Sequence, residues 1–250
     1  MKKFNLLSVV VPAYKQEKTI VNDISRLFNV LDKLNIDYEV VVVVDGFLDG
    51  TYNKIKKIKS KKLKLYGYDK NQGKGYAVKC GMLKTKGDIV GFIDAGMDIN
   101  PSAFFILLDF MKLHNADIIV GSKLHPDSVV RYPVKRRILS WGYRVFTHLL
   151  FGFNVKDTQV GLKLFKREVV RSVFPRLLIK QFAFDVETLA VAYSLGYTRI
   201  YEAPIKLTFK DKSSITSRSF WRIIFFMLWD TVAVFYRLRI LHYYVKHRNI

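Results

Sequence analysis

The sequence predicts an α/β fold, a mostly parallel sheet flanked by helices, and three observations lead to this prediction. Short apolar runs alternate with helical patterns, and two of these runs stop at an acidic residue. Half of the 250 residues are hydrophobic, which allows a sizeable core. Such alternation is typical of βαβ units with right-handed crossovers. We expect one large domain over residues 1–212 and a helical segment over residues 213–250.

Each element is expected where the hydrophobic period and its flanking turn residues agree. Apolar runs predict strands at Leu6–Pro12, Tyr38–Asp45, Leu63–Gly67, Asp88–Asp94, Ala116–Ser122 and Arg199–Phe209. Helical patterns cover Lys18–Leu34, Thr51–Lys59, Tyr76–Thr85, Ser102–His114 and Phe184–Leu195. After Ser122 the pattern becomes less regular, and a basic, aromatic stretch, Arg131–Phe153, follows. No internal repeat or low-complexity linker divides the chain.

The charge balance indicates an anionic partner. Lys and Arg number 42 against 21 Asp and Glu, a formal net charge of +21. Phosphorylated small molecules, acidic membrane surfaces and nucleic acid all suit such a charge. The single cysteine, Cys80, rules out an internal disulfide. The apolar run near the start is short and lacks a cleavage site, so we expect neither a signal peptide nor a transmembrane helix, which needs ~20 apolar residues.

The stretch from Gly87 to Pro101, GDIVGFIDAGMDINP, holds the first candidate site. Its apolar run is typical of a strand buried on both faces, and the run stops at Asp94. Open α/β sheets bind ligands at the carboxyl ends of their strands. Asp94 and Asp98 together suit a hard divalent cation, Mg²⁺ or Mn²⁺, with substrate phosphate completing its shell. Alternatively, Asp94 only ends the strand and Asp98 caps the helix after Pro101.

Other strand ends carry comparable loops. The candidate binding residues of these loops are Pro12, Tyr14, Glu17, Asp45, Gly73, Lys74 and Gly75. Paired glycines allow a ligand to approach the backbone, and a lysine between them can meet a phosphate. Each loop alone reads as an ordinary turn. Together they converge on one crevice, because the carboxyl ends of parallel strands share one edge of the sheet.

Five motifs in this order resemble those of the family-2 glycosyltransferases with the GT-A fold. They read VPAYKQE, VVDGFLDGT, NQGKGYA, DAGMD and FDVE, and the likeness extends from about Leu6 to Ser214. More narrowly, the chain resembles the polyprenyl-phosphate sugar transferases. The segment DTQVGLKLF, at Asp157–Phe165, is most similar to the dolichyl-phosphate glucosyltransferase branch.

The resemblance implies an inverting transfer of a sugar, glucose by this likeness, from a UDP- or GDP-sugar to a polyprenyl phosphate of the dolichyl type. It places the metal at Asp94 and Asp98 and gives catalytic roles to Asp94 and Asp185, with Asp185 facing the sugar or the acceptor. The implied donor-binding residues are Pro12, Tyr14, Glu17, Asp45, Gly73, Lys74 and Asp94.

The motifs also depart from the family pattern. Lys15 and Gln16 replace an Asn-Glu pair, and Val44 replaces the first aspartate of a VDD motif. Gly96 stands where the DAD-type metal motif has its second aspartate, which leaves Asp98 as the second carboxylate. Weak metal dependence, altered donor preference and lost catalysis are all consistent with these changes.

Basic residues after the fifth expected strand suggest a site for the acceptor phosphate. They are Lys123, Arg131, Arg136, Arg137 and Arg144. Guanidinium groups bind phosphate oxygens through paired hydrogen bonds, although each of these side chains alone also fits a solvated surface. The stretch KDKSS, with Lys210, Lys212 and Ser214, predicts a flap over the phosphates or, equally, a polar turn.

The tail, Ser219–Tyr244, predicts a mostly apolar helix with a narrow polar stripe. Its aromatic content and flanking arginines favour a helix lying on an anionic membrane surface, so we expect a peripheral protein on the cytoplasmic face of a membrane. The alternatives are packing on the core or against a second copy in a homo-oligomer.

Two other functions remain open, and a third is not expected. With a glycan or protein acceptor, Asp185 would act as a true general base. A nucleotide-sugar-binding pseudoenzyme would bind donor without turnover. Nucleic-acid binding is excluded as the expectation, since no RRM, KH, zinc-finger or helix-turn-helix signature accompanies the charge.

Overall fold

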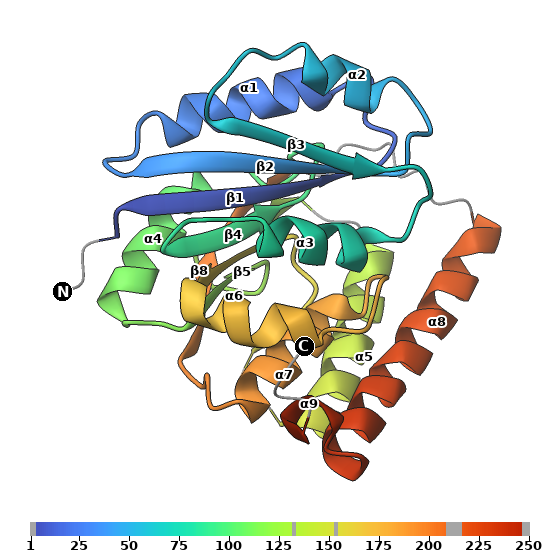
Figure 1. The fold of residues 1–250 in the computed structure, drawn as a ribbon. Helices are drawn as coiled ribbons and strands as arrows, with labels where there is room; N and C mark the ends of the chain where they lie inside the picture. The colour runs from blue at the N-terminus through green and yellow to red at the C-terminus, as the bar shows by residue number, and fades with distance from the viewer. Residues whose placement is uncertain (1–3, 132–133, 153–154, 209–216, 247–250) are drawn as a thin grey trace.

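The computed structural model describes residues 4–131, 134–152, 155–208 and 217–246. A seven-stranded sheet of order β3-β2-β1-β4-β7-β5-β8 forms its centre (Figure 1). The strands are β1 Leu6–Ala13, β2 Asp37–Asp45, β3 Leu63–Tyr68, β4 Ile89–Ile93, β5 Ile118–Ser122, β7 Leu162–Lys166 and β8 Ile200–Pro204. Every pairing is parallel except those of β7, which runs antiparallel to both β4 and β5. The expected mostly parallel α/β sheet is confirmed.

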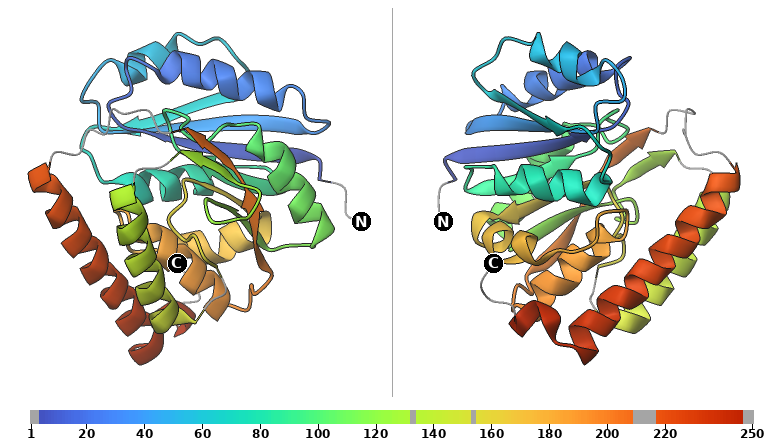
Figure 2. Two further views of the ribbon diagram at one scale, coloured as in Figure 1. Left: turned by 180° about the vertical axis from the view of Figure 1, so that it is seen from behind. Right: turned by 45° about the vertical axis from the view of Figure 1, so that its right-hand side comes forward.

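Helices cover both faces of this sheet. The helices of the described residues are α1 Ile20–Leu31, α2 Thr51–Lys56, α3 Lys74–Leu83, α4 Ala103–Leu113, α5 Val134–Phe151, α6 Arg167–Val173, α7 Phe184–Ser194, α8 Ser217–Phe235 and α9 Tyr243–Lys246. Helices α3, α6 and α7 lie on one face and α4 on the other, whereas α1 and α2 lie together beside β2 and β3 (Figures 1 and 2). Short helical turns occupy Phe174–Arg176 and Tyr236–Ile240.

The core forms because the strands are apolar on both sides. Strand β2 contributes the run Val40–Val44, all of it buried. In α1, Ile20, Ile24, Leu27 and Leu31 are buried at helical spacing, so the helix places one apolar stripe against the body. Five of the six expected strands and all five expected helices exist, with ends shifted by a few residues.

Strand β7 and helix α5 were not expected as regular elements. In β7 the sequence LKLFK places Lys163 in the middle of a buried strand. Two short strands, β6 Val129–Arg131 and β9 Lys206–Thr208, pair in parallel as a second sheet. The structure therefore divides the long strand expected at Arg199–Phe209 into β8 and β9.

Helices α5 and α8 lie side by side, on the side of the molecule away from α1 and α2 (Figures 1 and 2). The Tyr143 hydroxyl of α5 and the Thr231 hydroxyl of α8 share a buried hydrogen bond of 2.8 Å. In the described part of the chain, no helix is both long and apolar enough to cross a membrane. The boundary expected after residue 212 falls outside the described residues.

Candidate active site

Asp94 lies where β4 ends, at the carboxyl edge of the parallel strands. The Lys74 ammonium, at the start of α3, is 2.7 Å from Asp94 Oδ1 and donates a hydrogen bond of 2.8 Å to Oδ2. Burial alone disfavours a charged lysine, but Asp94 and Asp185 outweigh it and raise the pKa of Lys74. The glycine-lysine loop and the acidic loop therefore meet in one charged cluster, as the shared strand edge predicted.

Gly161, just before β7, fixes the position of Asp94. Its carbonyl accepts a hydrogen bond of 3.0 Å from the Asp94 N–H. A Cβ added at Gly161 would overlap the Asp94 carboxylate, so a larger residue would displace that carboxylate from its present position. The DTQVGLKLF segment thus takes part in the site through its backbone.

Asp45, at the end of β2, organises the loop that precedes α3. Its carboxylate accepts hydrogen bonds from the Tyr68 hydroxyl (2.8 Å), the Asn71 amide (2.7 Å) and the backbone N–H groups of Gln72 (2.7 Å) and Gly73 (3.0 Å). The side chain is almost fully buried. The structure thus shows Asp45 holding the Gly73–Lys74 loop, and its expected contact with donor stays a prediction.

The two glycines of this loop allow close packing against the segment before α7. A Cβ at Gly73, whose φ is +104°, would lie 2.5 Å from the Lys180 carbonyl oxygen. One at Gly75 would lie 2.8 Å from the Ile179 carbonyl oxygen. Both approaches are too short for any side-chain carbon. The Lys180 carbonyl also accepts a hydrogen bond of 3.2 Å from the Tyr76 N–H.

Asp185 and Lys163 form a fully buried ion pair beneath the Lys74–Asp94 pair. The Lys163 ammonium also donates a hydrogen bond of 2.8 Å to the Val160 carbonyl. Burial raises the pKa of Asp185, and the two lysines oppose that rise. Burial lowers the pKa of Lys163, and the nearby Asp185 carboxylate, which would raise that pKa, does not outweigh burial. The sequence indicated Asp185 but missed Lys163, because a lysine between two leucines reads as a surface residue.

Glu187, the second acid of FDVE, points away from this cluster. It is completely buried and accepts hydrogen bonds from the Leu178 N–H, the Ile179 N–H and the Tyr244 hydroxyl. Burial raises the pKa of Glu187. The two acids of the motif therefore have separate environments, although they lie two residues apart.

The loop after Asp94 carries the second expected metal ligand. The Gly96 N–H donates a hydrogen bond of 3.1 Å to the Asp23 carboxylate of α1, and the Asp98 carbonyl accepts one of 3.0 Å from the Thr208 N–H. No cluster of three or more His, Cys, Asp or Glu side chains in the described ranges is arranged to hold a metal. Asp94 Oδ1 is buried without a hydrogen bond of normal geometry and has a cation beside it. That environment fits a cation whose shell is completed by phosphate oxygens.

The remaining expected donor residues lie at the end of β1 and just after it. Pro12 pairs with Val43 in the sheet, and the Tyr14 ring is exposed. The Glu17 carboxylate accepts a hydrogen bond of 3.1 Å from the Gly50 N–H, which ties the first loop to the second. Their donor contacts stay predictions.

The expected acceptor cations are only partly described. Lys123 follows β5, with its ammonium 3.4 Å from the Asp157 carboxylate and its N–H bonded to that group at 2.8 Å. Arg144 lies on α5 and is partly exposed. The side chains of Arg131, Arg136 and Arg137 and the whole of Lys210, Lys212 and Ser214 lie outside the described part of the structure.

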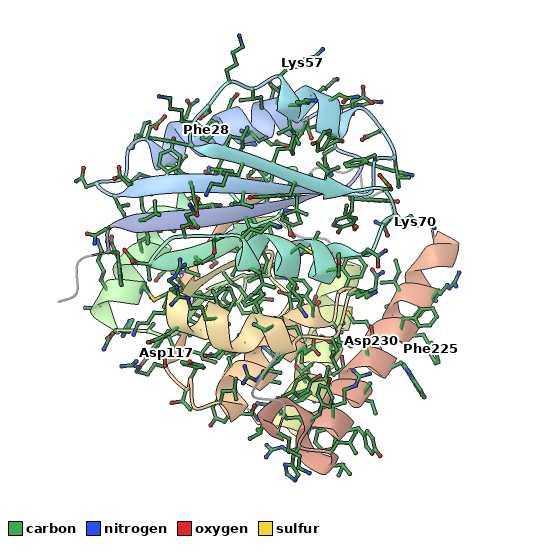
Figure 3. All side chains as sticks on the ribbon, viewed as in Figure 1. Phe28, Lys57, Lys70, Asp117, Phe225 and Asp230 are labelled. Carbon is green, nitrogen blue, oxygen red and sulfur yellow. The ribbon has the colours of Figure 1, made fainter. Side chains whose placement is uncertain are left out.

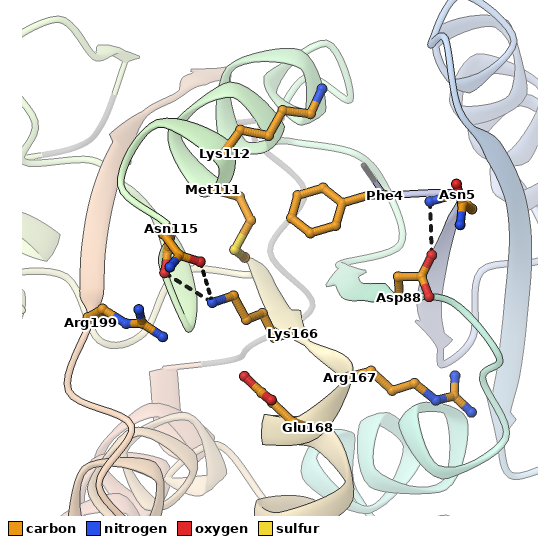
Figure 4. Close-up of a pocket in the computed structure, with 10 residues that line it drawn as sticks. All are labelled: Phe4, Asn5, Asp88, Met111, Lys112, Asn115, Lys166, Arg167, Glu168 and Arg199. Carbon is orange, nitrogen blue, oxygen red and sulfur yellow. Dashed lines mark hydrogen bonds between the residues drawn. The ribbon is translucent and has the colours of Figure 1, made fainter. Parts of the chain in front are cut away.

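A cavity of about 700 Å³ lies at the opposite edge of the sheet (Figure 4). Its walls come from the starts of β1, β4, β5 and β8, where Asn5, Asp88, Asn115 and Arg199 lie. Three of its cations form hydrogen bonds within the protein: Lys166 donates to the Asn115 carbonyl (3.0 Å), Arg167 to the Gly87 carbonyl (3.0 Å), and Arg199 to the Asp117 carboxylate (2.6 Å). None of the residues that line this cavity belongs to the five motifs that resemble those of the glycosyltransferases.

A mostly parallel sheet with charged loops gathered at its carboxyl edge defines the α/β enzymes that bind their ligands there. The chain belongs to glycosyl transferase family 2, whose model matches residues 8–174, and it is a glycosyltransferase.

Among curated proteins, the chain is 35% identical over 224 residues to the dolichyl-phosphate beta-glucosyltransferase of Dictyostelium discoideum, covering 84% of this chain and 68% of that protein. It is 32% identical to the Drosophila melanogaster enzyme of the same name, with 89% and 74% covered. These matches confirm the resemblance on which the expected function rests.

Solved structures confirm the GT-A type of fold. Mannosyl-3-phosphoglycerate synthase from Rubrobacter xylanophilus superposes with a TM-score of 0.71 at 17% identity, covering 94% of this chain and 74% of that one. Glucosyl-3-phosphoglycerate synthase from Mycobacterium tuberculosis, in complex with Mn²⁺ and UDP-glucose, superposes with a TM-score of 0.67 at 18% identity, covering 93% and 78%.

Proposed function

We propose that this chain transfers glucose from UDP-glucose to a polyprenyl phosphate of the dolichyl type, with inversion at the anomeric carbon. The observation that carries the proposal is the meeting of Lys74, Asp94 and Asp185 at the carboxyl edge of the sheet. The dolichyl-phosphate beta-glucosyltransferases similar to this chain support the choice of sugar and acceptor.

The donor diphosphate would lie beside Asp94 and Lys74. Asp94 and Asp98 would hold Mg²⁺ or Mn²⁺, which neutralises charge developing on the leaving nucleotide. In the described structure Lys74 bonds Asp94 directly. Its ammonium is therefore close enough to donate to phosphate oxygens from the helix start, where the backbone also favours anions.

The acceptor phosphate attacks the anomeric carbon: a new carbon–oxygen bond forms as the bond to the diphosphate breaks. Since a phosphate monoester is ionised at pH 7, this step requires no proton transfer to a general base. Its main demand is positioning of two anions against their repulsion. Lys123 and Arg144, after β5 and on α5, would supply cations, and Asp185 would orient the sugar.

The acceptor is a lipid, so the chain needs a way to reach a membrane surface. On α8, Trp221, Phe225, Trp229 and Val232 recur at helical spacing and are all exposed. Figure 3 shows Phe225 projecting from α8 away from the body of the molecule. Aromatic side chains on one helix face are typical of peripheral membrane binding, and the +21 charge favours an anionic leaflet.

The test incubates the full chain with labelled UDP-glucose, UDP-galactose or GDP-mannose, a short polyprenyl phosphate, and Mg²⁺ or Mn²⁺. We expect label from UDP-glucose to enter the organic phase. Asp94→Ala should lower that transfer by about 100-fold or more, as for removal of a group that stabilises transition-state charge. Asp109→Ala removes an exposed acid of α4 and serves as the matched control.

Transfer to a free glycan or peptide without lipid phosphate would contradict the proposed acceptor. UDP-glucose binding with no transfer to any acceptor would favour the pseudoenzyme instead.

A further inference from the structure

The C-terminal helix α9 reaches back into the core and contacts the acidic motif. The Tyr244 hydroxyl donates a hydrogen bond of 2.7 Å to Glu187 Oε1, and both residues are completely buried. The same carboxylate accepts hydrogen bonds of 2.9 Å from the N–H groups of Leu178 and Ile179. One carboxylate thus joins α7, α9 and the segment 177–183.

A second set of contacts holds the start of this segment and the helical turn before it, Phe174–Arg176. The Arg176 guanidinium donates a hydrogen bond of 3.0 Å to the Tyr244 carbonyl. From α3, the Lys79 ammonium donates hydrogen bonds to the carbonyls of Leu177 (2.7 Å) and Pro175 (3.1 Å). Charged groups form most of these bonds, and bonds of that kind are stronger than neutral ones.

The segment 177–183 in turn forms the wall against which the donor loop packs. Carbonyl oxygens of Ile179 and Lys180 lie against the α-carbons of Gly75 and Gly73, with no room for a side chain between them. A displacement of residues 178–180 toward the Gly73–Gly75 loop would therefore push that loop, and a displacement away would remove its support. Lys74, within that loop, bonds Asp94.

We propose that Glu187 and Tyr244 are positioning residues for the donor site, and that through them the C-terminal helices set the affinity for the nucleotide sugar. The path runs from Tyr244 to Glu187, to the backbone of 178–180, to the Gly73–Gly75 loop and to the Lys74–Asp94 pair. The donor-affinity part of this inference rests on the proposed function, whereas the mechanical coupling does not.

The same path gives α8 a second role. It is followed directly by the helical turn Tyr236–Ile240 and by α9, so the helix with the exposed aromatic stripe is covalently close to Tyr244. A surface bound by α8 therefore lies only a few residues of chain away from the Tyr244–Glu187 contact.

The test compares Tyr244→Phe with Tyr236→Phe in the full chain. Each change removes one hydroxyl, buried at position 244 and half-exposed at position 236. Hydrogen exchange followed by mass spectrometry should show faster exchange for Tyr244→Phe in peptides covering 174–184 and also 70–78. The KM for UDP-glucose should rise about 3- to 10-fold, less than the full loss of a hydrogen bond to a charged group, because the effect reaches the donor loop only through residues 178–180. The kcat and the acceptor KM should be nearly unchanged.

Faster exchange confined to 174–184, with an unaltered donor KM, would overturn the coupling and leave a local structural contact. Should the wild type transfer no sugar at all, the proposed function fails, but the exchange of 70–78 still decides the coupling. If Tyr244→Phe does not fold, Arg176→Gln replaces it, because this change removes the hydrogen bond from Arg176 to the Tyr244 carbonyl. The exchange of 70–78 and the donor KM then decide the coupling in the same way.

Discussion

At the scale of single residues, Asp94 depends on a neighbour without a side chain. Gly161 lies against its carboxylate and accepts its N–H, while Lys74 holds the other side. A glycine beside a charged group leaves space for that group, and the sequence alone does not show which group occupies the space.

Gly161→Ala is expected to displace the Asp94 carboxylate and lower sugar transfer by at least about tenfold, because positioning errors near 1 Å are costly. Circular dichroism should show a retained fold. Gly142→Ala is the matched control, since nothing lies within 4 Å of a Cβ at Gly142 and alanine suits its helix. Equal transfer by both variants would contradict the geometry assigned to Gly161.

Lys163→Met leaves Asp185 buried without its partner, and such a loss costs about 3–5 kcal/mol. We expect a lower midpoint in urea denaturation. The double variant Lys163→Met/Asp185→Leu removes both charges and should recover much of that stability. If the double variant is no more stable than the single one, the Lys163–Asp185 pair does not account for the loss.

At the scale of elements, the sequence predicted the first four parallel strands and their carboxyl-edge loops, because period and turn residues are local signals. It did not predict β7. The lysine in the middle of β7 interrupts the apolar pattern that predicts a buried strand. Its partner Asp185, which allows the lysine to be buried, is distant in sequence and lies on α7. Likewise, the role of Glu187 depends on Tyr244, 57 residues further on, which no local pattern reveals.

For α8, we expect Phe225→Asp combined with Trp229→Asp to lower binding to vesicles containing anionic lipid by about tenfold or more, because charged residues on the inserted face are expensive. Phe225 and Trp229 are 63% and 65% exposed, so the fold should tolerate the change. Vesicle sedimentation measures the effect.

Val21→Asp combined with Ser25→Asp, at two exposed positions of α1, adds the same two charges away from α8 and is the control. If neither variant changes sedimentation, α8 is not the membrane-binding surface.

At the scale of the whole molecule, the two ends of the parallel strands differ in what they hold. The candidate site lies at their carboxyl ends, while Glu39 stabilises the opposite end through hydrogen bonds. Its carboxylate accepts hydrogen bonds from Ser8 of β1 (2.6 Å), the Lys86 N–H before β4 (2.6 Å) and the Lys64 ammonium of β3. One side chain of β2 thus links four strands or their flanking turns.

Burial opposes the effect, but these three hydrogen bonds lower the pKa of Glu39 below its ordinary value of 4.5. A lowered carboxyl pKa in the folded state stabilises the protein above pH 4.5, and this contribution is lost as the pH falls through the folded-state pKa. Glu39→Gln should therefore lower the free energy of unfolding at pH 7 by about 1 kcal/mol and have a smaller effect in acid.

Chemical denaturation at pH 7 and pH 3.5 checks this prediction, with exposed Glu168→Gln as the control. An equal loss of stability at both pH values would show that Glu39 acts through packing and not through its charge.

The central claim is that Asp94 and Lys74, at the carboxyl edge, bind the donor diphosphate together with a divalent ion. Calorimetric titration of UDP-glucose into the wild type, Asp94→Asn and Asp109→Asn, with and without Mn²⁺, tests it most directly. We predict Mn²⁺-dependent binding that Asp109→Asn retains and Asp94→Asn weakens by at least about tenfold. Equal affinity of all three proteins, or binding indifferent to Mn²⁺, would contradict the account.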